Sequence, residues 1–552
     1  MMVAIPGNSN NDEGDAGSRA GTGPVSQWSG FRGGADRLGW AAGPSSASND
    51  TLWTFDAGRP IQSSPVIGGG LLFFGSDSGY IHALNPSSGI EVWNRSAGEF
   101  ATVQSTPCYD DGALYIGTQN GSHSELLALN ASDGGLLWSV PDDSGIPSSP
   151  VESDGTVYYG SLNGSMVAVT STSGSILWQT QRDGDIWGSP AVWNGTVFAG
   201  TIKGEVFALW AENGTVRWNI TYPYPWTVYA TPAVRNGTVY IGLANYGALK
   251  GELLALDAAT GAIKWNFTEC QSVYASVAVT DDVLYAHIWN KTVGGGFLAA
   301  MPLEEPSGDG VMARSELLWS FQTFDWEGGS SPLVTDNAVI VGSTDNRVYA
   351  VNRTTGIQLW NVTTQGIIVS SPAVFERKVF AGSMDGKLYS IGSVSELPGM
   401  KLTMKLERES LASGSVMRIS VWLRDEAGNP VEGGYIKFRV GAGNLSQNGA
   451  STFPDGSQSV KFMAQSVKAN TTVTLTAEGA RGGLAPTTGS VSFTVTPYQS
   501  TYQNVKSQST FNAAKYTPYF IALAVLCGAD ITLLGMFIKR RWLTSGKPRS
   551  PQ

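Results

Sequence analysis

The stretch that decides the fold occupies residues 64–93 and reads SPVIGGGLLFFGSDSGYIHALNPSSGIEVW. It opens with Ser-Pro-Val, passes through a glycine turn, and continues as two short apolar runs separated by Asp-Ser-Gly. It then ends in the pattern Ser-Gly-x-x-x-Trp. Short apolar runs bounded by Gly, Asn, Asp and Ser are typical of β-strands joined by tight turns. The stretch therefore predicts a small sheet of four short strands.

The same unit recurs along the chain, with closing tryptophans 40 to 54 residues apart. A repeat of about 40–45 residues that holds four strands is typical of a β-propeller blade. Eight opening segments, most of them Ser/Thr-Pro, predict eight blades. Trp53 precedes the first opener, so we expect the strand at residues 52–55 to complete the last blade and close the ring. The closing tryptophans are Trp53, Trp93, Trp138, Trp178, Trp218, Trp265, Trp319 and Trp360.

These tryptophans are predicted to be structural. An indole ring can cover the apolar face between neighbouring blades while its N–H reaches a backbone carbonyl. The glycines that recur beside them allow the positive φ of tight turns. A residue that recurs in every blade serves the fold, whereas a cofactor site would occur once.

The motif Ala-x-Asn/Asp-x-x-Ser/Thr-Gly-x-x-x-Trp, found at residues 83–93, 168–178, 255–265 and 350–360, resembles the tryptophan-docking motif of pyrroloquinoline-quinone (PQQ)-type propellers. The lead-in Trp28-Ser-Gly-Phe31-Arg32-Gly-Gly also looks like the segment that opens such propellers. The resemblance covers about residues 28–391. It implies the propeller fold, which is shared by quinone-dependent dehydrogenases and by non-catalytic relatives such as the assembly-factor lipoprotein of the bacterial outer-membrane barrel machinery.

The dehydrogenases of this family use a catalytic Asp, calcium ligands, an Arg on the quinone and, often, a disulfide between adjacent cysteines. Here the three cysteines, Cys108, Cys270 and Cys527, are far apart, and the blades are short and nearly uniform. Three dispersed histidines also cannot form a zinc triad. We therefore predict no catalytic residue, metal or cofactor; a PQQ-dependent dehydrogenase with calcium is the alternative.

One pattern stands above the repeat. The segment that joins each closing tryptophan to the next opener is predicted to rim the central channel on one face, and in four consecutive blades it is aromatic, with interspersed acids such as Asp183 and Asp185. Aromatic and acidic groups together suit a sugar, a cationic ligand or a protein segment; alternatively, these rings plug the channel mouth. The predicted rim residues are Trp187, Tyr224, Trp226, Tyr229, Tyr274, Phe324 and Trp326.

The chain continues beyond the repeats. Residues 1–27 are predicted to be disordered, 28–395 to form the propeller, and 399–498 to form a sandwich of alternating strands. Asp425-Glu-Ala-Gly-Asn-Pro-Val431 resembles the bacterial immunoglobulin-like domains of adhesins. Polar residues 499–516 are predicted to form a stalk, 517–538 a transmembrane helix and 539–552 a basic cytoplasmic tail, because 518–538 has a single charge and basic residues follow it.

This arrangement predicts a single-pass cell-membrane protein with the propeller and the sandwich outside. A tail-anchored protein whose bulk is cytoplasmic is the alternative, since residues 1–27 contain no apolar signal sequence. Fifteen Asn-x-Ser/Thr sequons favour a location outside the cell, where asparagine can be glycosylated. Asn-Gly-Thr is also a sequence that suits tight turns, which is the alternative explanation for some of them. The candidate glycosylation sites are Asn94, Asn163, Asn194, Asn236, Asn352 and Asn361.

The net charge of −10 argues against nucleic acid as a partner. The function that we expect is a non-catalytic surface binding or scaffold protein whose propeller binds a glycan or an envelope protein. The alternatives are a membrane-tethered quinoprotein dehydrogenase and a factor for the assembly of envelope proteins.

Overall fold

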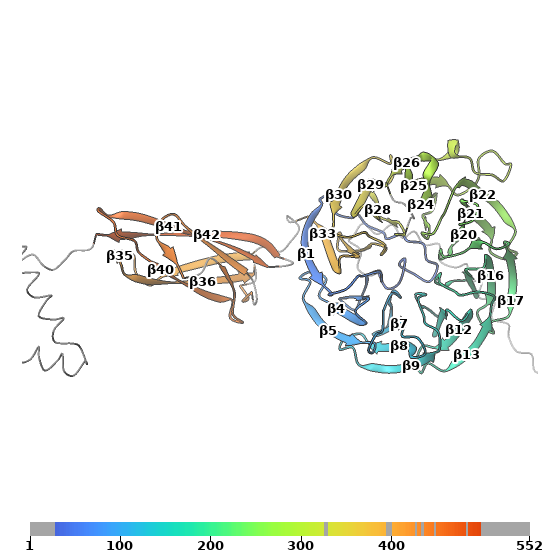
Figure 1. The fold of residues 1–552 in the computed structure, drawn as a ribbon, viewed down its shortest axis with the longest axis horizontal. Coiled ribbons are helices and arrows are strands. Elements are labelled where there is room, and N and C mark those ends of the chain that lie inside the picture. Colours follow the sequence, from blue (N-terminus) through green and yellow to red (C-terminus); the bar gives the residue numbers. More distant parts are fainter. Residues whose placement is uncertain are drawn as a thin grey trace, which may run out of the picture.

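The computed structural model describes residues 28–324, 329–393, 400–425, 428–431, 435–446, 449–481 and 484–497. Within these ranges the chain is nearly all β, and its helices are two short 3₁₀ turns, η1 (Lys291–Val293) and η2 (Arg314–Glu316). Figure 1 shows a ring of small sheets that contains the first part of the chain, and a separate strand-rich body that contains the second.

The ring is built from sheets whose strands follow one another in sequence. The first sheet contains β2 (Val66–Gly68), β3 (Leu71–Gly75), β4 (Tyr80–Leu84) and β5 (Glu91–Ser96). The next two contain β6 (Cys108–Asp110), β7 (Ala113–Gly117), β8 (Ser124–Asn130) and β9 (Leu136–Asp142), then β10 (Val151–Ser153), β11 (Thr156–Gly160), β12 (Ser165–Thr170) and β13 (Ile176–Gln181). The fourth contains β14 (Ala191–Trp193), β15 (Thr196–Gly200), β16 (Glu205–Trp210) and β17 (Val216–Thr221).

The later sheets repeat this order with small additions. The fifth contains β19 (Ala233–Arg235), β20 (Thr238–Asn245), β21 (Lys250–Asp257) and β22 (Ile263–Cys270), and β18 (Trp226–Thr227) pairs with β20 as an extra strand. The sixth contains β23 (Ala278–Val279), β24 (Val283–Asn290), β25 (Gly295–Pro302) and β26 (Trp319–Gln322). The seventh contains β27 (Leu333–Val334), β28 (Ala338–Ser343), β29 (Arg347–Asn352) and β30 (Gln358–Thr363).

The last sheet joins the two ends of the repeat region. It contains β31 (Ala373–Phe375), β32 (Lys378–Gly382) and β33 (Lys387–Gly392), and its outer strand is β1 (Asp50–Asp56) from the start of the chain. β1 pairs antiparallel with β33, and Trp53 lies opposite Ser390. The first strand thus completes the final sheet, which leaves no gap in the ring seen in Figure 1. Small sheets arranged in a closed ring are the architecture of a β-propeller.

A belt of hydrogen bonds also closes the ring on its inner side. The backbone N–H of Ser64 donates to the Thr106 hydroxyl at 3.0 Å, and each later opener donates to the hydroxyl of the next. The belt ends where Ser371 donates to the Ser64 hydroxyl at 2.9 Å. The backbone N–H of each belt residue therefore has an acceptor, which matters because an unpaired buried N–H is costly. The belt residues are Ser64, Thr106, Ser149, Ser189, Thr231, Ser276, Ser331 and Ser371.

The closing tryptophans connect neighbouring sheets. The indole N–H of Trp178, for example, donates to the Ala211 carbonyl of the next repeat at 2.8 Å. The other seven indoles donate in the same way, and that of Trp360 reaches the Ser46 carbonyl near the start of the chain. Their rings cover apolar side chains between adjacent sheets, which is the position that the sequence predicted for them.

A glycine of the next repeat makes room for each of several of these rings, and this close approach leads to a first prediction. Gly174 has φ +69°, and a Cβ there would lie 2.5 Å from the Trp138 ring. Gly174→Ala is expected to lower the free energy of unfolding by about 2–4 kcal/mol, because backbone strain adds to overpacking. Urea denaturation measures the change. Gly155→Ala is the matched control, since Gly155 has φ +79° but nothing within 4 Å of its Cβ position. An equal loss in both variants would show that the indole contact contributes nothing.

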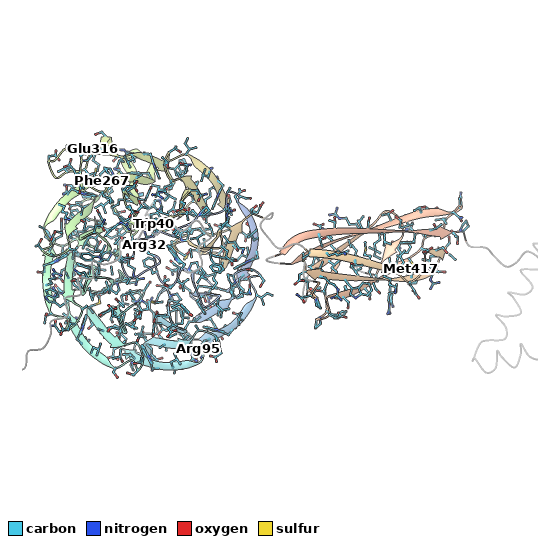
Figure 2. All side chains as sticks on the ribbon, turned by 180° about the vertical axis from the view of Figure 1, so that it is seen from behind. Arg32, Trp40, Arg95, Phe267, Glu316 and Met417 are labelled. Atoms are coloured by element: carbon cyan, nitrogen blue, oxygen red, sulfur yellow. The ribbon has the colours of Figure 1, made fainter. Side chains whose placement is uncertain are left out.

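The lead-in segment, residues 28–46, closes one end of the channel. Its backbone bonds to the ends of the inner strands, for instance at Trp28 with Ile67, at Asp36 with Val234, and at Gly39 with Val334. The side chains of Arg32 and Arg37 are buried here, and Figure 2 shows Arg32 and Trp40 lying toward the centre of the ring. The inner strands run from the belt toward this segment, so the joining loops lie at the opposite end.

The second body is a sandwich of two sheets. One sheet contains β34 (Met400–Leu406), β36 (Val416–Asp425), β40 (Ser457–Met463) and β38 (Asn444–Leu445). The other contains β35 (Ser410–Ala412), β42 (Leu484–Thr496), β41 (Thr471–Arg481), β37 (Tyr435–Val440) and β39 (Gly449–Ser451). Alternating apolar residues of both sheets, among them Ile419, Phe462 and Phe493, form one shared core.

Several predictions from the sequence lie outside the described residues: the disordered segment 1–27, the stalk 499–516, the transmembrane helix 517–538, the tail 539–552 and Trp326. The junction between propeller and sandwich, at 394–399, lies outside them as well. No helix in the part that is described is long and apolar enough to cross a membrane.

Candidate functional site

The candidate site is the rim of the ring at the end opposite the lead-in segment, which we call the mouth. Its walls are the loops that join each outer strand to the next inner strand, together with the turns between the two middle strands of each sheet. Chain direction places both sets of loops at the end opposite the lead-in segment. These loops are freer to vary than the strands, so the mouth is where repeats that are otherwise similar can differ.

Four aromatic rings form a continuous row on one side of the mouth. Trp187 meets Tyr229 edge to face with ring centroids 6.1 Å apart, and Tyr229 meets Tyr274 at 5.5 Å. Tyr274 is stacked on Tyr246 at 5.4 Å. Trp187 is 38% exposed and Tyr246 is 54% exposed, so the two ends of the row face solvent. Such partly exposed rings can bind a ligand and support one another at the same time.

Tyr246 was missed by the sequence analysis. It lies in the turn between β20 and β21, whereas the predicted rim residues all come from the loops between consecutive sheets. The signal was available, since this repeat extends its middle turn with Asn-Tyr-Gly-Ala-Leu, where other repeats have a short turn such as Asp-Ser-Gly.

The remaining predicted rim residues do not join the row. Trp226 is half-buried, contacts Tyr222 at 5.3 Å and packs against the core between the fourth and fifth sheets. Tyr224 and Phe324 are exposed at 84% and 64%, and none of the resolved ring contacts includes either. Trp326 lies outside the described residues. The predicted patch is therefore smaller than the sequence suggested, and its centre is the row of four rings.

The other side of the mouth is polar. The Gln62 side-chain amide donates to Asp77 at 2.9 Å, and the Gln104 amide donates to the other oxygen of Asp77 at 3.3 Å. Gln119 then donates to the Gln104 side-chain carbonyl at 3.1 Å. These half-buried amides and the carboxylate come from the first two repeats and their joining loops. The mouth thus presents an aromatic side and a side of hydrogen-bonding groups.

Acidic groups modify the aromatic side. Burial raises the pKa of the Tyr229 hydroxyl, and nearby Tyr246 and Asp185 raise it further. The ring therefore stays neutral at physiological pH and can donate a hydrogen bond. Asp183, the other predicted acid, is bound by the Lys203 ammonium at 2.7 Å on the exposed surface.

One set of side chains resembles a hydrolytic triad. The Nε2 atom of His82 lies 3.3 Å from the Ser76 hydroxyl, and its Nδ1 atom lies 2.7 Å from the Glu91 carboxylate. Ser76 is fully buried, however, so a substrate cannot reach it. At the position of His82, two later repeats have Tyr349 and Tyr389, whose hydroxyls donate to carboxylates of the neighbouring turn. The set is therefore one version of a structural contact that fixes this turn.

The channel residues that the structure describes do not fit PQQ with calcium. Among the described residues, no group of three or more His, Cys, Asp or Glu side chains is placed to hold a metal ion. The two buried guanidinium groups, Arg32 and Arg37, direct their donors to backbone carbonyls of the inner strands and the lead-in segment. The donor set that a quinone and its cation require is thus not assembled among the described residues.

The candidate glycosylation sites lie on the surface of the ring. Asn94, Asn163, Asn194 and Asn236 are exposed, whereas Asn352 and Asn361 are half-buried. Asn194 and Asn236 have positive φ, at 46° and 48°, in tight turns, as expected from their Asn-Gly sequences. Turn geometry therefore explains these two asparagines without glycosylation.

A closed ring of four-stranded sheets, joined by tryptophans in a repeated docking motif, defines the class of PQQ-like β-propellers. The family model described as "Outer membrane protein assembly factor BamB" matches residues 42–267 and 308–396, which is more than half of the chain. The chain therefore belongs to this family.

Curated relatives and solved structures agree with this placement. The outer membrane protein assembly factor BamB of Yersinia pestis is 29% identical over 152 residues, which cover 24% of this chain and 37% of the relative. The chain thus matches little more than a third of that relative's length. The crystal structure of BamB from Moraxella catarrhalis superposes with a TM-score of 0.50 at 20% identity, covering 62% of this chain and 97% of that one. The crystal structure of the quinohemoprotein alcohol dehydrogenase from Comamonas testosteroni superposes with a TM-score of 0.54 at 13% identity, covering 68% of this chain and 82% of that one. At these identities the superpositions show the fold alone.

Proposed function

We propose that the chain is a non-catalytic binding protein of the cell envelope, and that the mouth of an eight-bladed propeller holds a segment of another envelope protein. The row of rings from Trp187 to Tyr246 supports this most directly, because exposed aromatic side chains in a supporting cluster are typical of protein interfaces. The family relation supports it too, since the relatives named BamB are described as assembly factors for outer membrane proteins.

The rest of the proposal concerns the position of the propeller relative to the cell membrane. An immunoglobulin-like sandwich, the stalk 499–516, the membrane helix 517–538 and the tail 539–552 would hold the propeller outside the cell membrane, with the C-terminus in the cytoplasm. The apolar character of 518–538 and the basic residues after it support this orientation.

A glycan is the second candidate for the same mouth. The observation that favours it is the polar side of the mouth. Gln62, Asp77 and Gln104 form this side, and the aromatic row forms the other. Amide and carboxylate groups bind sugar hydroxyls, whereas aromatic rings stack on the apolar faces of sugars. An assembly factor and a glycan-binding protein predict different ligands for the same residues, so one pair of variants tests both.

Trp187→Ala is expected to weaken binding of the partner about 30-fold, since hot-spot aromatic residues contribute about 2 kcal/mol or more. The melting temperature should hardly change, because Trp187 is an exposed end of the row. A photo-crosslinking amino acid in place of Tyr246 first captures the partner in cells. Titration of the purified partner against the unmodified protein and the Trp187→Ala variant then gives the two affinities. A glycan array on the same proteins tests the second candidate.

Trp226→Ala is the matched control. Because Trp226 packs into the core between two sheets, this variant should melt at a lower temperature while it keeps its affinity. If Trp187→Ala lowers only the melting temperature, the row merely plugs the mouth and the proposal is wrong.

A further inference from the structure

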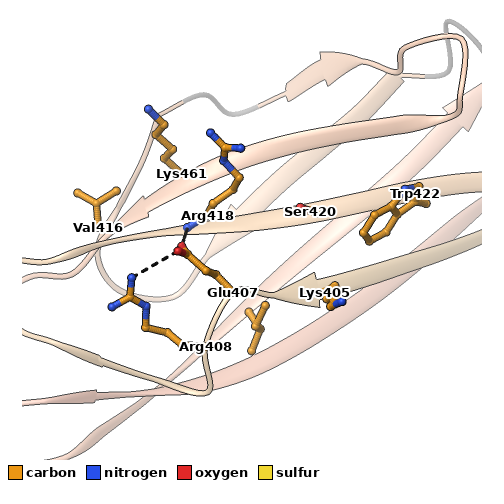
Figure 3. Close-up of a pocket in the computed structure, with 9 residues that line it drawn as sticks. Lys405, Glu407, Arg408, Val416, Arg418, Ser420, Trp422 and Lys461 are labelled. Atoms are coloured by element: carbon orange, nitrogen blue, oxygen red, sulfur yellow. Dashed lines mark hydrogen bonds and ion pairs between the residues drawn. The ribbon is translucent and has the colours of Figure 1, made fainter.

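A second surface lies on the sandwich, on the solvent side of the sheet formed by β34, β36 and β40. Figure 3 shows the groove there, which has a volume of about 590 Å³. Lys405, Arg418 and Lys461 line it together with Trp422. The one acid in its lining, Glu407, lies 3.5 Å from Arg408 and accepts a hydrogen bond from the Arg418 backbone N–H at 3.0 Å, so both of its oxygens are engaged.

Like charges face one another across the strands of this sheet. Lys401 lies directly opposite Arg424, and Arg418 lies directly opposite Lys461. Like charges in such cross-strand positions destabilise a sheet. None of the outward-facing positions of these three strands is acidic. The sheet thus keeps two like-charged pairs on its outer face. Glu407 lowers the repulsion at Arg418 and Asp455 lowers it at Arg424, and an external anion would lower it further.

Apolar side chains share the same face. Val416 and Met463 are directly opposite one another and are 44% and 52% exposed. They lie next to the Arg418–Lys461 pair, and Trp422 lies further along β36. A soluble polyanion would need only the cations for binding, and the exposed apolar side chains would add nothing. Exposed apolar groups beside cations, with a tryptophan, are instead the composition of surfaces that lie in the headgroup region of a bilayer.

We propose that this face of the sandwich binds the anionic phospholipid headgroups of the membrane that carries the protein. The position of the face along the chain supports this occupant, since the apolar segment 518–538 begins 22 positions after Thr496. At about 3.3–3.6 Å per residue, such a linker keeps the sandwich within about 80 Å of the bilayer. The inference rests on the proposed anchor for this proximity but not for the chemistry of the face.

The test uses the full-length protein in nanodiscs of phosphatidylcholine alone and of phosphatidylcholine mixed equally with phosphatidylglycerol. Amine acylation followed by mass spectrometry measures how fast Lys405 and Lys461 react. In the anionic discs we expect both to react at least about threefold more slowly, and we expect salt to remove the protection. Lys437, on the outer face of the other sheet, should react equally in both discs.

Charge reversal provides the matched variants. Arg418→Glu with Lys461→Glu should abolish the protection of Lys405, whereas Lys437→Glu with Arg439→Glu, on β37 of the other sheet, should preserve it. Equal reaction rates of Lys405 and Lys461 in the two discs would overturn the inference.

Association of the protein with the same discs tests the proposed membrane helix 517–538 separately. A chain that enters neutral discs is anchored, whatever the lysines show. A chain that associates only with anionic discs refutes the anchor and supports the face, and a chain that associates with neither refutes both.

Discussion

Replacing Arg37 with methionine is expected to lower the free energy of unfolding by about 3–5 kcal/mol. The guanidinium group is fully buried and donates to the Pro190, Ser149 and Pro150 carbonyls, each at 3.0 Å. It also donates to the Phe31 carbonyl within the lead-in segment at 2.7 Å. One side chain thus connects this segment to the residues that precede two different inner strands, β10 and β14. Methionine fills a similar volume without any donor.

Two effects oppose each other in this substitution. Burial lowers the pKa of Arg37 to about 10, which shows that the charged group is costly to keep in this place. Methionine avoids that cost, but it leaves three buried carbonyls and the part-buried Phe31 carbonyl without this donor. Hydrogen bonds from charged groups contribute about 1.5–3 kcal/mol each. The loss of the donors is therefore the larger effect.

Urea denaturation followed by tryptophan fluorescence measures the result. The control is Arg59→Met, because Arg59 is exposed on a joining loop, and its replacement should change stability by less than about 0.5 kcal/mol. If both variants unfold at the same urea concentration, the hydrogen bonds of Arg37 do not stabilise the ring.

The sequence predicted the repeat and its tryptophans because each repeat carries its own local signal. Turn glycines, strand alternation and the closing tryptophan occur within about forty residues, so no long-range information is needed to recognise them. The alternating strands of the sandwich were predicted for the same reason, since strands such as β36 alternate between apolar and polar residues along their whole length.

Contacts between distant parts of the chain could not be predicted in this way. The sequence marks Arg32 and Arg37 as part of a familiar lead-in, but nothing local shows that they bond to carbonyls more than a hundred residues away. The hydroxyl belt has the same character. The openers were recognised as strand starts, whereas their role in linking one repeat to the next depends on the closed ring.

The mouth was predicted only in part because exposure depends on packing. Trp187 and Trp226 look equivalent in the sequence, since both lie in loops that precede an opener. In the structure Trp187 faces solvent, while Trp226 belongs to the extra strand β18 and packs into a core. The pairing of β18 with the lengthened β20 decides this difference, and a single repeat read alone cannot show it.

Trp178→Ala is the second variant for which we expect a large effect, a loss of about 3–5 kcal/mol in the free energy of unfolding. The ring is 9% exposed and lies 5.9 Å from the Tyr158 ring. A Cβ on Gly214 of the next repeat would lie 2.5 Å from it, so the indole fills the space that this glycine leaves. Alanine would leave a cavity between two sheets and an Ala211 carbonyl without its indole donor.

Trp210→Ala is the control for this variant, because it removes an indole of the same size from the neighbouring sheet. Trp210 is 44% exposed, and its main contact is the Arg217 guanidinium, 4.4 Å from the ring centroid. Its loss should cost about 0.5–1 kcal/mol, as for other exposed cation–π contacts. Chemical denaturation of the two variants side by side isolates the contribution of the position between the sheets. A ring whose sheets were held together only by the belt and the lead-in segment would give two similar values. A difference of several kcal/mol means that each repeat depends on the indole of the repeat before it, which explains why this residue recurs around the ring while the residues of the mouth do not.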